Sequence, residues 1–391
     1  MLRKTRLFTP GPTPILPAAQ TAMASFGMHH RTAEFRALYT KFLADLKVFV
    51  GTKNDVMVLA SSGTGAMEAA VSNLTSPGDQ VIVVTAGKFG ERWTGLAKAY
   101  GCSVDVVDAP YGKTVKPSDV GAQVNNETRV VYMQATESST GARHDVQRIA
   151  KAVHEKNPNT LLVVDAITGL GTTTIDVDGW GIDMLIGGSQ KAVMIPPGLA
   201  YVSVSERAWQ AMESAKSPRY YFDLRKERKS AAKGESAFTP ATSLIAAFAA
   251  ALDYIASQAG GDLAAGREAL IANAEMAAAM TRAAAVALGL ELFSAESPAA
   301  ALTAIVPPKE VDSSVLVKAL RERFGAIVAN GQGEMKGKMI RIAHLGFYDY
   351  LDTIAIIGAL EHVLAGINIP KHSEFGVGLK AAQVVYARGR A

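Results

Sequence analysis

The sequence of 391 residues predicts an α/β protein: a large domain built on a mostly parallel sheet, followed by a smaller α+β domain at the C-terminus. Short apolar, β-branched runs alternate repeatedly with helical stretches before Gly198, as in a parallel sheet covered by helices. The chain is longer than one hydrophobic core usually holds, which favours two domains. A long alanine-rich helical region after Leu244 is interrupted at Gly260 and Gly261, where we place the domain change.

The elements of the large domain are expected in the following order. Prolines at positions 10, 12, 14 and 17 predict an extended arm over residues 1–20, since proline prevents regular helix. An amphipathic helix follows the stretch HHRTAEF (residues 29–35) and reaches Phe49. Apolar runs predict strands at residues 56–60, 80–85, 104–107, 130–134, 161–164 and 200–205. Helices are expected from Ala66 onward, at 119–125 and at 149–154.

Beyond Gly260 the pattern is shorter and mixed, as in an α+β domain. Strands are expected at residues 301–306 and 339–343, and helices at 314–324 and 351–365. The polar segment before these elements contains the basic run 225–229, and it is expected to be a solvated loop.

Composition and charge exclude several classes of protein. Apolar residues make up 49% of the chain and charged residues 19%, which is globular and not disordered. A net charge of +4 is too small to indicate a nucleic-acid partner. Cys102 is the only cysteine, so no intramolecular disulfide forms and a reducing compartment is expected. The basic N-terminus is interrupted by Pro10 and Pro12, and no apolar run reaches about 18 residues, so we expect a cytoplasmic protein without a membrane partner.

A candidate anion site follows the first predicted strand. Ser62, Gly63 and Thr64 stand between that strand and a helix, where backbone N–H groups are free and the helix dipole favours negative charge. No GK[ST] sequence closes the turn, so it is not a P-loop. The adjacent histidines His29 and His30 have no third ligand at a metal-binding spacing, and we predict no metal site.

A carboxylate and a lysine in apolar surroundings suggest cofactor chemistry. Asp165 stands at the end of the predicted strand 161–164, and Lys191 follows in the stretch GGSQK between two apolar runs. A lysine can form a Schiff base with an aldehyde, and an acid can pair with the pyridine nitrogen of pyridoxal phosphate. Taken singly, an aspartate that caps a turn and a surface lysine would explain each residue equally well.

The segment 161–198 resembles the cofactor region of the class V, fold-type I pyridoxal-phosphate enzymes. It is most similar to the alanine–glyoxylate and serine–glyoxylate (serine–pyruvate) aminotransferases, in which a strand ends in D and GSQK is later followed by PPG. The resemblance covers nearly the whole chain, from PGPTPI to RIAHLG. It implies an N-terminal arm at residues 1–20, a pyridoxal-phosphate-binding large domain at 21–259 and a small domain at 260–391.

The resemblance also implies roles for individual residues. Phe89 would stack on the cofactor ring, where the family commonly has tryptophan, and Ser138 of the stretch ESSTG would lie near the cofactor. Thr239 would reach the cofactor phosphate of the neighbouring subunit, although Ser236 replaces a tyrosine that often shares this task. The implied cofactor-binding residues are Ser62, Gly63, Thr64, Phe89, Ser138, Asp165, Gln190, Lys191 and Thr239.

Arg341 is the candidate substrate anchor. An arginine among apolar residues is costly to bury unpaired, and its planar fork fits a carboxylate. An internal salt bridge is the alternative on the residues alone. The resemblance assigns this arginine to the substrate α-carboxylate, with Ala343 in place of a family glycine.

The expected function is therefore a ping-pong aminotransferase that moves the amino group of alanine or serine to glyoxylate or pyruvate. Lys191 would carry pyridoxal phosphate and act as the general acid and base, in a homodimer with shared active sites. An aminotransferase for another amine, such as 2-aminoethylphosphonate, and a non-catalytic interaction subunit like a soluble hydrogenase small subunit remain as alternatives. A cysteine desulfurase is disfavoured because the only cysteine, Cys102, precedes Lys191.

Overall fold

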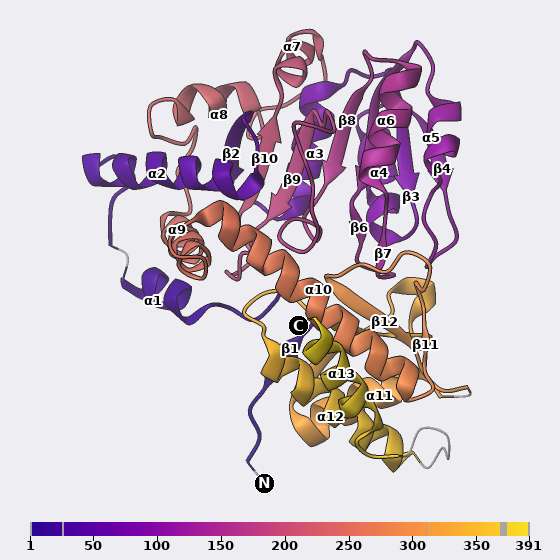
Figure 1. The fold of residues 1–391 in the computed structure, drawn as a ribbon. Helices are drawn as coiled ribbons and strands as arrows, with labels where there is room; N and C mark the ends of the chain where they lie inside the picture. Colours follow the sequence, from indigo (N-terminus) through magenta and orange to yellow (C-terminus); the bar gives the residue numbers. More distant parts are fainter. Residues whose placement is uncertain (1, 26, 310, 368–373, 390–391) are drawn as a thin grey trace.

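The computed structural model describes residues 2–25, 27–309, 311–367 and 374–389, which form a large part and a smaller part (Figure 1). The large part contains a seven-stranded sheet in which only β10 runs antiparallel to its neighbours. This confirms the predicted mostly parallel sheet. In spatial order its strands are β2 (Asp55–Leu59), β10 (Ala200–Val204), β9 (Met184–Gly188), β8 (Leu161–Asp165), β5 (Thr128–Gln134), β3 (Gln80–Thr85) and β4 (Ser103–Asp108).

Helices cover both faces of this sheet and create two apolar cores. On one face Phe42 packs against Phe248, with ring centroids 5.1 Å apart, and on the other Trp93 stacks on Tyr132 at 4.6 Å. All four side chains are fully buried. The helices of this part are α2 (Ala33–Val50), α3 (Gly63–Leu74), α4 (Lys88–Ala99), α5 (Pro117–Gln123), α6 (Val146–Lys156), α7 (Glu206–Ser214), α8 (Leu224–Ala231) and α9 (Thr242–Ser257).

The smaller part is built on a mixed five-stranded sheet, which confirms the expected α+β arrangement. Its strands, in spatial order, are β1 (Arg6–Phe8), β13 (Ala326–Asn330), β14 (Ile340–Ala343), β12 (Leu302–Val306) and β11 (Glu291–Leu292). Helices α11 (Ser313–Phe324), α12 (Tyr350–Gly366) and α13 (Val377–Arg388) accompany it, and the long helix α10 (Leu263–Ala287) extends from the large part alongside it (Figure 1). The helical region is interrupted between α9 and α10, near Gly260. The division into domains at this residue stays a prediction.

The N-terminal arm differs from the expectation in two ways. Residues 17–20 are not extended, because helix α1 (Pro17–Ser25) begins at Pro17, and proline is tolerated in the first turn of a helix. The arm also joins the small sheet: β1 pairs in parallel with β13, with Leu7 opposite Ile327. It is therefore fixed at both ends.

The basic run 225–229 is helical and not a loop, so that prediction was wrong. It forms most of α8, which Asp223 caps by accepting a hydrogen bond from the backbone N–H of Arg225 at 3.2 Å. Arginine, lysine and glutamate favour helix, and the helix buries Leu224 and Glu227 against the large part. The run resembles a solvated loop in sequence because charged residues surround Leu224 and Glu227, the two residues that the helix buries.

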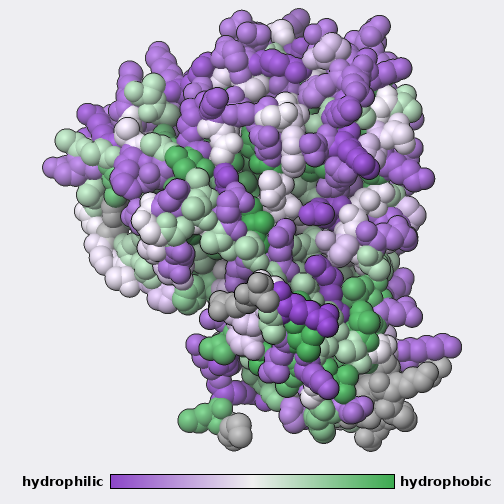
Figure 2. Space-filling view, viewed as in Figure 1, coloured by the Kyte–Doolittle hydropathy of each residue, from purple (hydrophilic) through white to green (hydrophobic). Residues whose placement is uncertain are grey.

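The other predicted elements are found close to their expected positions, although α3 begins at Gly63, three residues before the predicted start. Strands β9, β11 and β13 and helices α4, α7 and α13 were not predicted. In Figure 2 hydrophilic residues cover most of the upper, large part on this face. Among the described residues, no helix combines the length and apolar content that crossing a membrane requires.

The contact between α9 and α10 gives a test of the interface that joins the two parts. A Cβ atom on Gly266 would lie 2.2 Å from the carbonyl oxygen of Ile255. We expect Gly266→Ala to lower the free energy of unfolding by about 1–2 kcal/mol, because the overpacking outweighs the better helix propensity of alanine. Gly95→Ala in α4 is the matched control, since nothing lies within 4 Å of that position, and it should stabilise by up to about 1 kcal/mol. Thermal unfolding midpoints compare the two; equal shifts would contradict this packing.

Candidate active site

A cavity of about 220 Å³ lies at the carboxyl ends of the parallel strands in the large sheet. This is where open α/β sheets usually bind their ligands. The cavity brings together most of the predicted site residues: Ser62, Gly63, Thr64, Phe89, Ser138, Asp165, Gln190 and Lys191. Arg341 and Thr239 do not line it.

Lys191 is a buried amine in close contact with the N-terminal arm. Its Nζ donates a hydrogen bond to the carbonyl of Pro10. Gly11 has a positive φ of 143°, and a Cβ atom there would lie 2.6 Å from Nζ, so a side chain at this position would collide with the amine. Burial lowers the pKa of Lys191 to about 8; the charge of Asp165 opposes this shift and that of Arg341 adds to it. A substantial share of the amine is therefore neutral near pH 8 and able to act as a nucleophile.

Asp165 occupies the end of β8, as predicted from its place after the apolar run. Its Oδ1 accepts a hydrogen bond from the backbone N–H of Ile167 at 2.9 Å, and the side chain is only 5% exposed. Burial raises the pKa of Asp165 to about 6. The carboxylate is thus still mainly ionised at pH 7, and it can stabilise a positive charge in the cavity.

The N-terminus of α3 presents free backbone donors to the cavity. Ser62 is the N-cap residue, but its side chain makes no capping hydrogen bond, and α3 starts directly at Gly63. The N–H groups of Gly63 and Thr64 therefore have no intrahelical partner. The Oε1 atom of Gln190 is also buried without a hydrogen bond among the described residues. The free N–H groups fit an anionic ligand, and the Gln190 oxygen fits a ligand atom that donates a hydrogen bond.

Glu137 is the important residue that the sequence interpretation missed. The side chain is fully buried, and its Oε2 accepts hydrogen bonds from the backbone N–H groups of Phe89 at 3.0 Å and Gly90 at 3.1 Å. Its Oε1 accepts from the N–H and the hydroxyl of Ser139 at 3.0 and 2.6 Å. The carboxylate joins the first turn of α4 to the turn that carries Ser138, and so fixes Phe89 at the cavity.

Arg341 lies in β14 of the small sheet, 4% exposed, and points at the turn that borders the cavity. Its Nη1 donates to the carbonyl of Ser138 at 2.7 Å, and its Nη2 and Nε donate to the carbonyl of Asn330 at 2.7 and 3.1 Å. No acidic residue in the described ranges forms an ion pair with it, so the internal salt bridge is not found. Burial lowers the pKa of Arg341 to about 10, and the nearby Glu137 acts to raise it. The guanidinium therefore stays positively charged at neutral pH and can bind a carboxylate ligand.

Thr239 lies apart from the other predicted residues. It borders a separate cavity of about 30 Å³ together with Tyr221 and Glu227. Ser236, which stands where the family often has tyrosine, donates its hydroxyl hydrogen to the carbonyl of Phe238. The role of Thr239 toward a neighbouring subunit stays a prediction.

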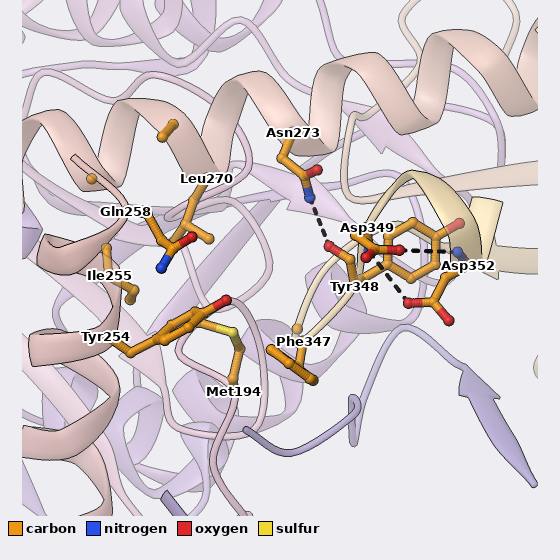
Figure 3. Close-up of a pocket in the computed structure, with 13 residues that line it drawn as sticks. Met194, Tyr254, Ile255, Gln258, Leu270, Asn273, Phe347, Tyr348, Asp349 and Asp352 are labelled. Atoms are coloured by element: carbon orange, nitrogen blue, oxygen red, sulfur yellow. Dashed lines mark hydrogen bonds between the residues drawn. The ribbon is translucent and has the colours of Figure 1, made fainter. Parts of the chain in front are cut away.

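A larger cavity of about 500 Å³ lies between α9, α10 and the segment that leads to α12 (Figure 3). The rings of Tyr254 and Phe347 contact each other edge-on, with centroids 6.0 Å apart, and Asn273 donates to the carbonyl of Tyr348 at 3.0 Å (Figure 3). Met194, three residues after Lys191, also borders it. No cationic side chain of the described residues lines this cavity, so the amine and the candidate anion site belong to the smaller one.

Comparison with known proteins agrees with this geometry. The profile of the family "Aminotransferase class-V" matches residues 9–347. The chain belongs to the class V aminotransferase family. Its relatives in this family include the soluble hydrogenase small subunit of Synechococcus sp. (strain PCC 6716), with 38% identity over 98% of this chain and 99% of that protein. The serine–glyoxylate aminotransferase of Methylorubrum extorquens has 30% identity over 92% of this chain and 90% of its own.

Solved structures extend the likeness within the class V family. The aspartate aminotransferase of subgroup IV from Thermus thermophilus superposes with a TM-score of 0.86 and 35% identity, over 93% of this chain and 99% of that one. The fold-type I architecture expected from the sequence is therefore confirmed, with a large mostly parallel sheet and a smaller mixed sheet.

The charges around Lys191 make a prediction that needs no ligand. Competitive labelling with acetic anhydride, followed by peptide mass spectrometry, should show Lys191 gaining reactivity with a midpoint near pH 8. Asp165→Asn removes the charge that raises this pKa, so the midpoint should move to lower pH. Arg341→Gln removes a charge that lowers it, so the midpoint should move to higher pH.

The exposed Lys151 on α6 serves as the internal control, since its labelling should follow the same curve in all three proteins. Shifts of Lys191 in the same direction in both variants would show that these two charges do not set its reactivity.

Proposed function

We propose that this class V family member is a pyridoxal-phosphate-dependent aminotransferase that transfers the amino group of alanine or serine to glyoxylate or pyruvate by a ping-pong mechanism. The observation that carries the proposal is the pairing of a buried lysine of lowered pKa with a buried, ionised carboxylate in one cavity. The name of the serine–glyoxylate aminotransferase relative supports serine and glyoxylate as substrates.

The residues of the cavity fit this cofactor. Lys191 would bind its aldehyde carbon, Asp165 its pyridine nitrogen and Phe89 one face of its ring. The free N–H groups at the start of α3 would hold the phosphate, with Ser138 and Gln190 as further polar contacts. When bound, pyridoxal phosphate supplies an aromatic ring that accepts the electrons released at the substrate Cα.

Each protein group then has a defined task. Arg341 binds the α-carboxylate of the amino acid in two parallel hydrogen bonds and so orients its Cα hydrogen. Lys191 Nζ would take this proton from Cα as a general base and deliver it, as a general acid, to the carbon that carries the aldehyde in the free cofactor. Asp165, ionised near neutral pH, would hold a proton at the ring nitrogen. Burial of all three side chains limits the access of water.

The choice of donor has specific rivals. The Thermus thermophilus structure carries the name aspartate aminotransferase, so L-aspartate must be tested beside L-alanine and L-serine. An aminotransferase for another amine, such as 2-aminoethylphosphonate, would use the same Lys191 and Asp165 with a different donor.

A non-catalytic interaction subunit is the second candidate, because a relative with 38% identity is named a soluble hydrogenase small subunit. The presence of Lys191, Asp165 and Arg341, positioned around one site, favours catalysis. Burying each of these three charges costs free energy, because each loses its hydration. A subunit without catalytic activity would gain nothing in return for this cost.

We also propose a homodimer with shared active sites. Thr239 lies outside the cavity of its own chain, next to exposed aromatic side chains. Tyr220 is 73% and Tyr221 47% exposed, and the ring of Tyr221 stacks on Phe238 at 4.9 Å. An exposed aromatic cluster beside Thr239 suits a subunit interface.

The test is the half-reaction. The protein loaded with pyridoxal phosphate should show a visible absorption band that L-alanine or L-serine, added without a keto acid, converts to that of the aminated cofactor with release of the keto acid. Lys191→Ala should abolish the conversion, whereas Lys151→Ala on the exposed face of α6 should leave it intact. Conversion by L-aspartate alone would reject the small-donor assignment. No band with added pyridoxal phosphate would favour the interaction subunit.

A further inference from the structure

The cavity contains a second cation that the proposed chemistry does not use. Arg92 lies one turn after Phe89 in α4 and lines the cavity. Its guanidinium carbon is 4.8 Å from the centre of the Phe89 ring, and its Nη1 donates a hydrogen bond to the hydroxyl of Thr64 at 2.9 Å. It forms no ion pair with any acidic residue in the described ranges. Arg92 therefore connects the aromatic face of the cavity to the N-terminus of α3.

The charge balance of the cavity requires such a group. A phosphate monoester carries a charge of about −1.5 to −2 at pH 7. The α3 dipole supplies about half a positive charge, and the positive charge of Lys191 interacts with the negative charge of Asp165. Lys191 and Arg92 are the only cationic side chains among the residues that line the cavity. Arg92 is thus the remaining cation available to an anion at Thr64.

We propose that Arg92 binds the phosphate group of the cofactor, together with the N–H groups at the start of α3. The proposal rests on the proposed function, in that it assumes pyridoxal phosphate as the ligand. The Thr64 hydroxyl bonded to Arg92 belongs to the turn with the free N–H groups, so both lie at the same end of the cavity. Arg341 does not line the cavity and reaches the turn at its border from another element, through the carbonyl of Ser138, which leaves it for the substrate. A guanidinium on a phosphate can donate two parallel hydrogen bonds, which no backbone N–H can match.

The test compares two ligands that differ only in the phosphate. Ligand-free protein is titrated with pyridoxal phosphate and with pyridoxal, and the absorbance of the bound ligand gives the dissociation constants. Arg92→Gln should weaken the binding of pyridoxal phosphate at least about tenfold, while pyridoxal binding changes less than about twofold. Arg92→Lys keeps a point charge and should fall between the wild type and Arg92→Gln. Inorganic phosphate should compete with pyridoxal phosphate more strongly in the wild type than in Arg92→Gln.

Arg148→Gln is the matched control, because it removes the same charge from an exposed position on α6 and should alter neither constant. An equal loss for both ligands in Arg92→Gln would overturn the proposal and assign Arg92 to the Phe89 ring. Unchanged binding of both ligands in Arg92→Gln would also overturn it. If that variant instead showed only a higher KM for L-aspartate, Arg92 would belong to substrate binding and not to the cofactor phosphate. If Arg92→Gln does not fold, Arg92→Lys replaces it in the test. It should weaken the binding of pyridoxal phosphate more than that of pyridoxal. Wild-type protein that binds neither ligand would overturn the proposed function, and this proposal with it.

Discussion

The structure depends on the burial of an amine, a carboxylate and a guanidinium within one region. Lys191, Asp165 and Arg341 come from the loop after β9, the end of β8 and the small sheet, so the two parts of the chain must meet for the charges to interact. Burial is the main cause of the pKa shift of each group, and the charges of Asp165 and Arg341 act in opposite directions on the pKa of Lys191. The fold thus buries Lys191 deeply enough to lower its pKa while it keeps the carboxylate of Asp165 in the same cavity.

Glu137 makes the arrangement rigid. One of its oxygens accepts from a backbone N–H in the first turn of α4, and the other accepts from a backbone N–H in the turn that carries Ser138. Neither segment can therefore move without breaking a buried hydrogen bond. Ser138, in the same turn, gives its carbonyl to Arg341. One carboxylate therefore supports both Phe89 and the turn whose carbonyl accepts the hydrogen bond of Arg341.

The sequence predicted six of the seven strands of the large sheet and missed β9, and it predicted that Asp165 ends a strand and that Lys191 follows it, because these depend on local periodicity and on short motifs. The anion site at the start of α3 stays a prediction. The roles of Glu137 and Arg92 could not be predicted in this way, since Glu137 bonds the backbone of Phe89, 48 residues away, and Arg92 bonds Thr64, 28 residues away. The pairing of β1 with β13 joins segments at opposite ends of the chain and left no local signal either. Helix α8 was missed because its charged residues concealed Leu224 and Glu227, which only tertiary contact identifies as buried. The division into domains and the roles assigned to single site residues remain predictions.

The N-terminal arm links the reactive amine to the small sheet. Phe8 ends a strand of that sheet, Pro10 accepts the hydrogen bond of Lys191, and the hydroxyl of Thr13 donates to the backbone carbonyl of Lys191 at 3.0 Å. Only Thr9 separates the strand from the contact with the amine. A rotation of the small sheet against the large one would therefore be transmitted through a single residue to the backbone carbonyl that contacts Nζ, which is a mechanical coupling within one chain.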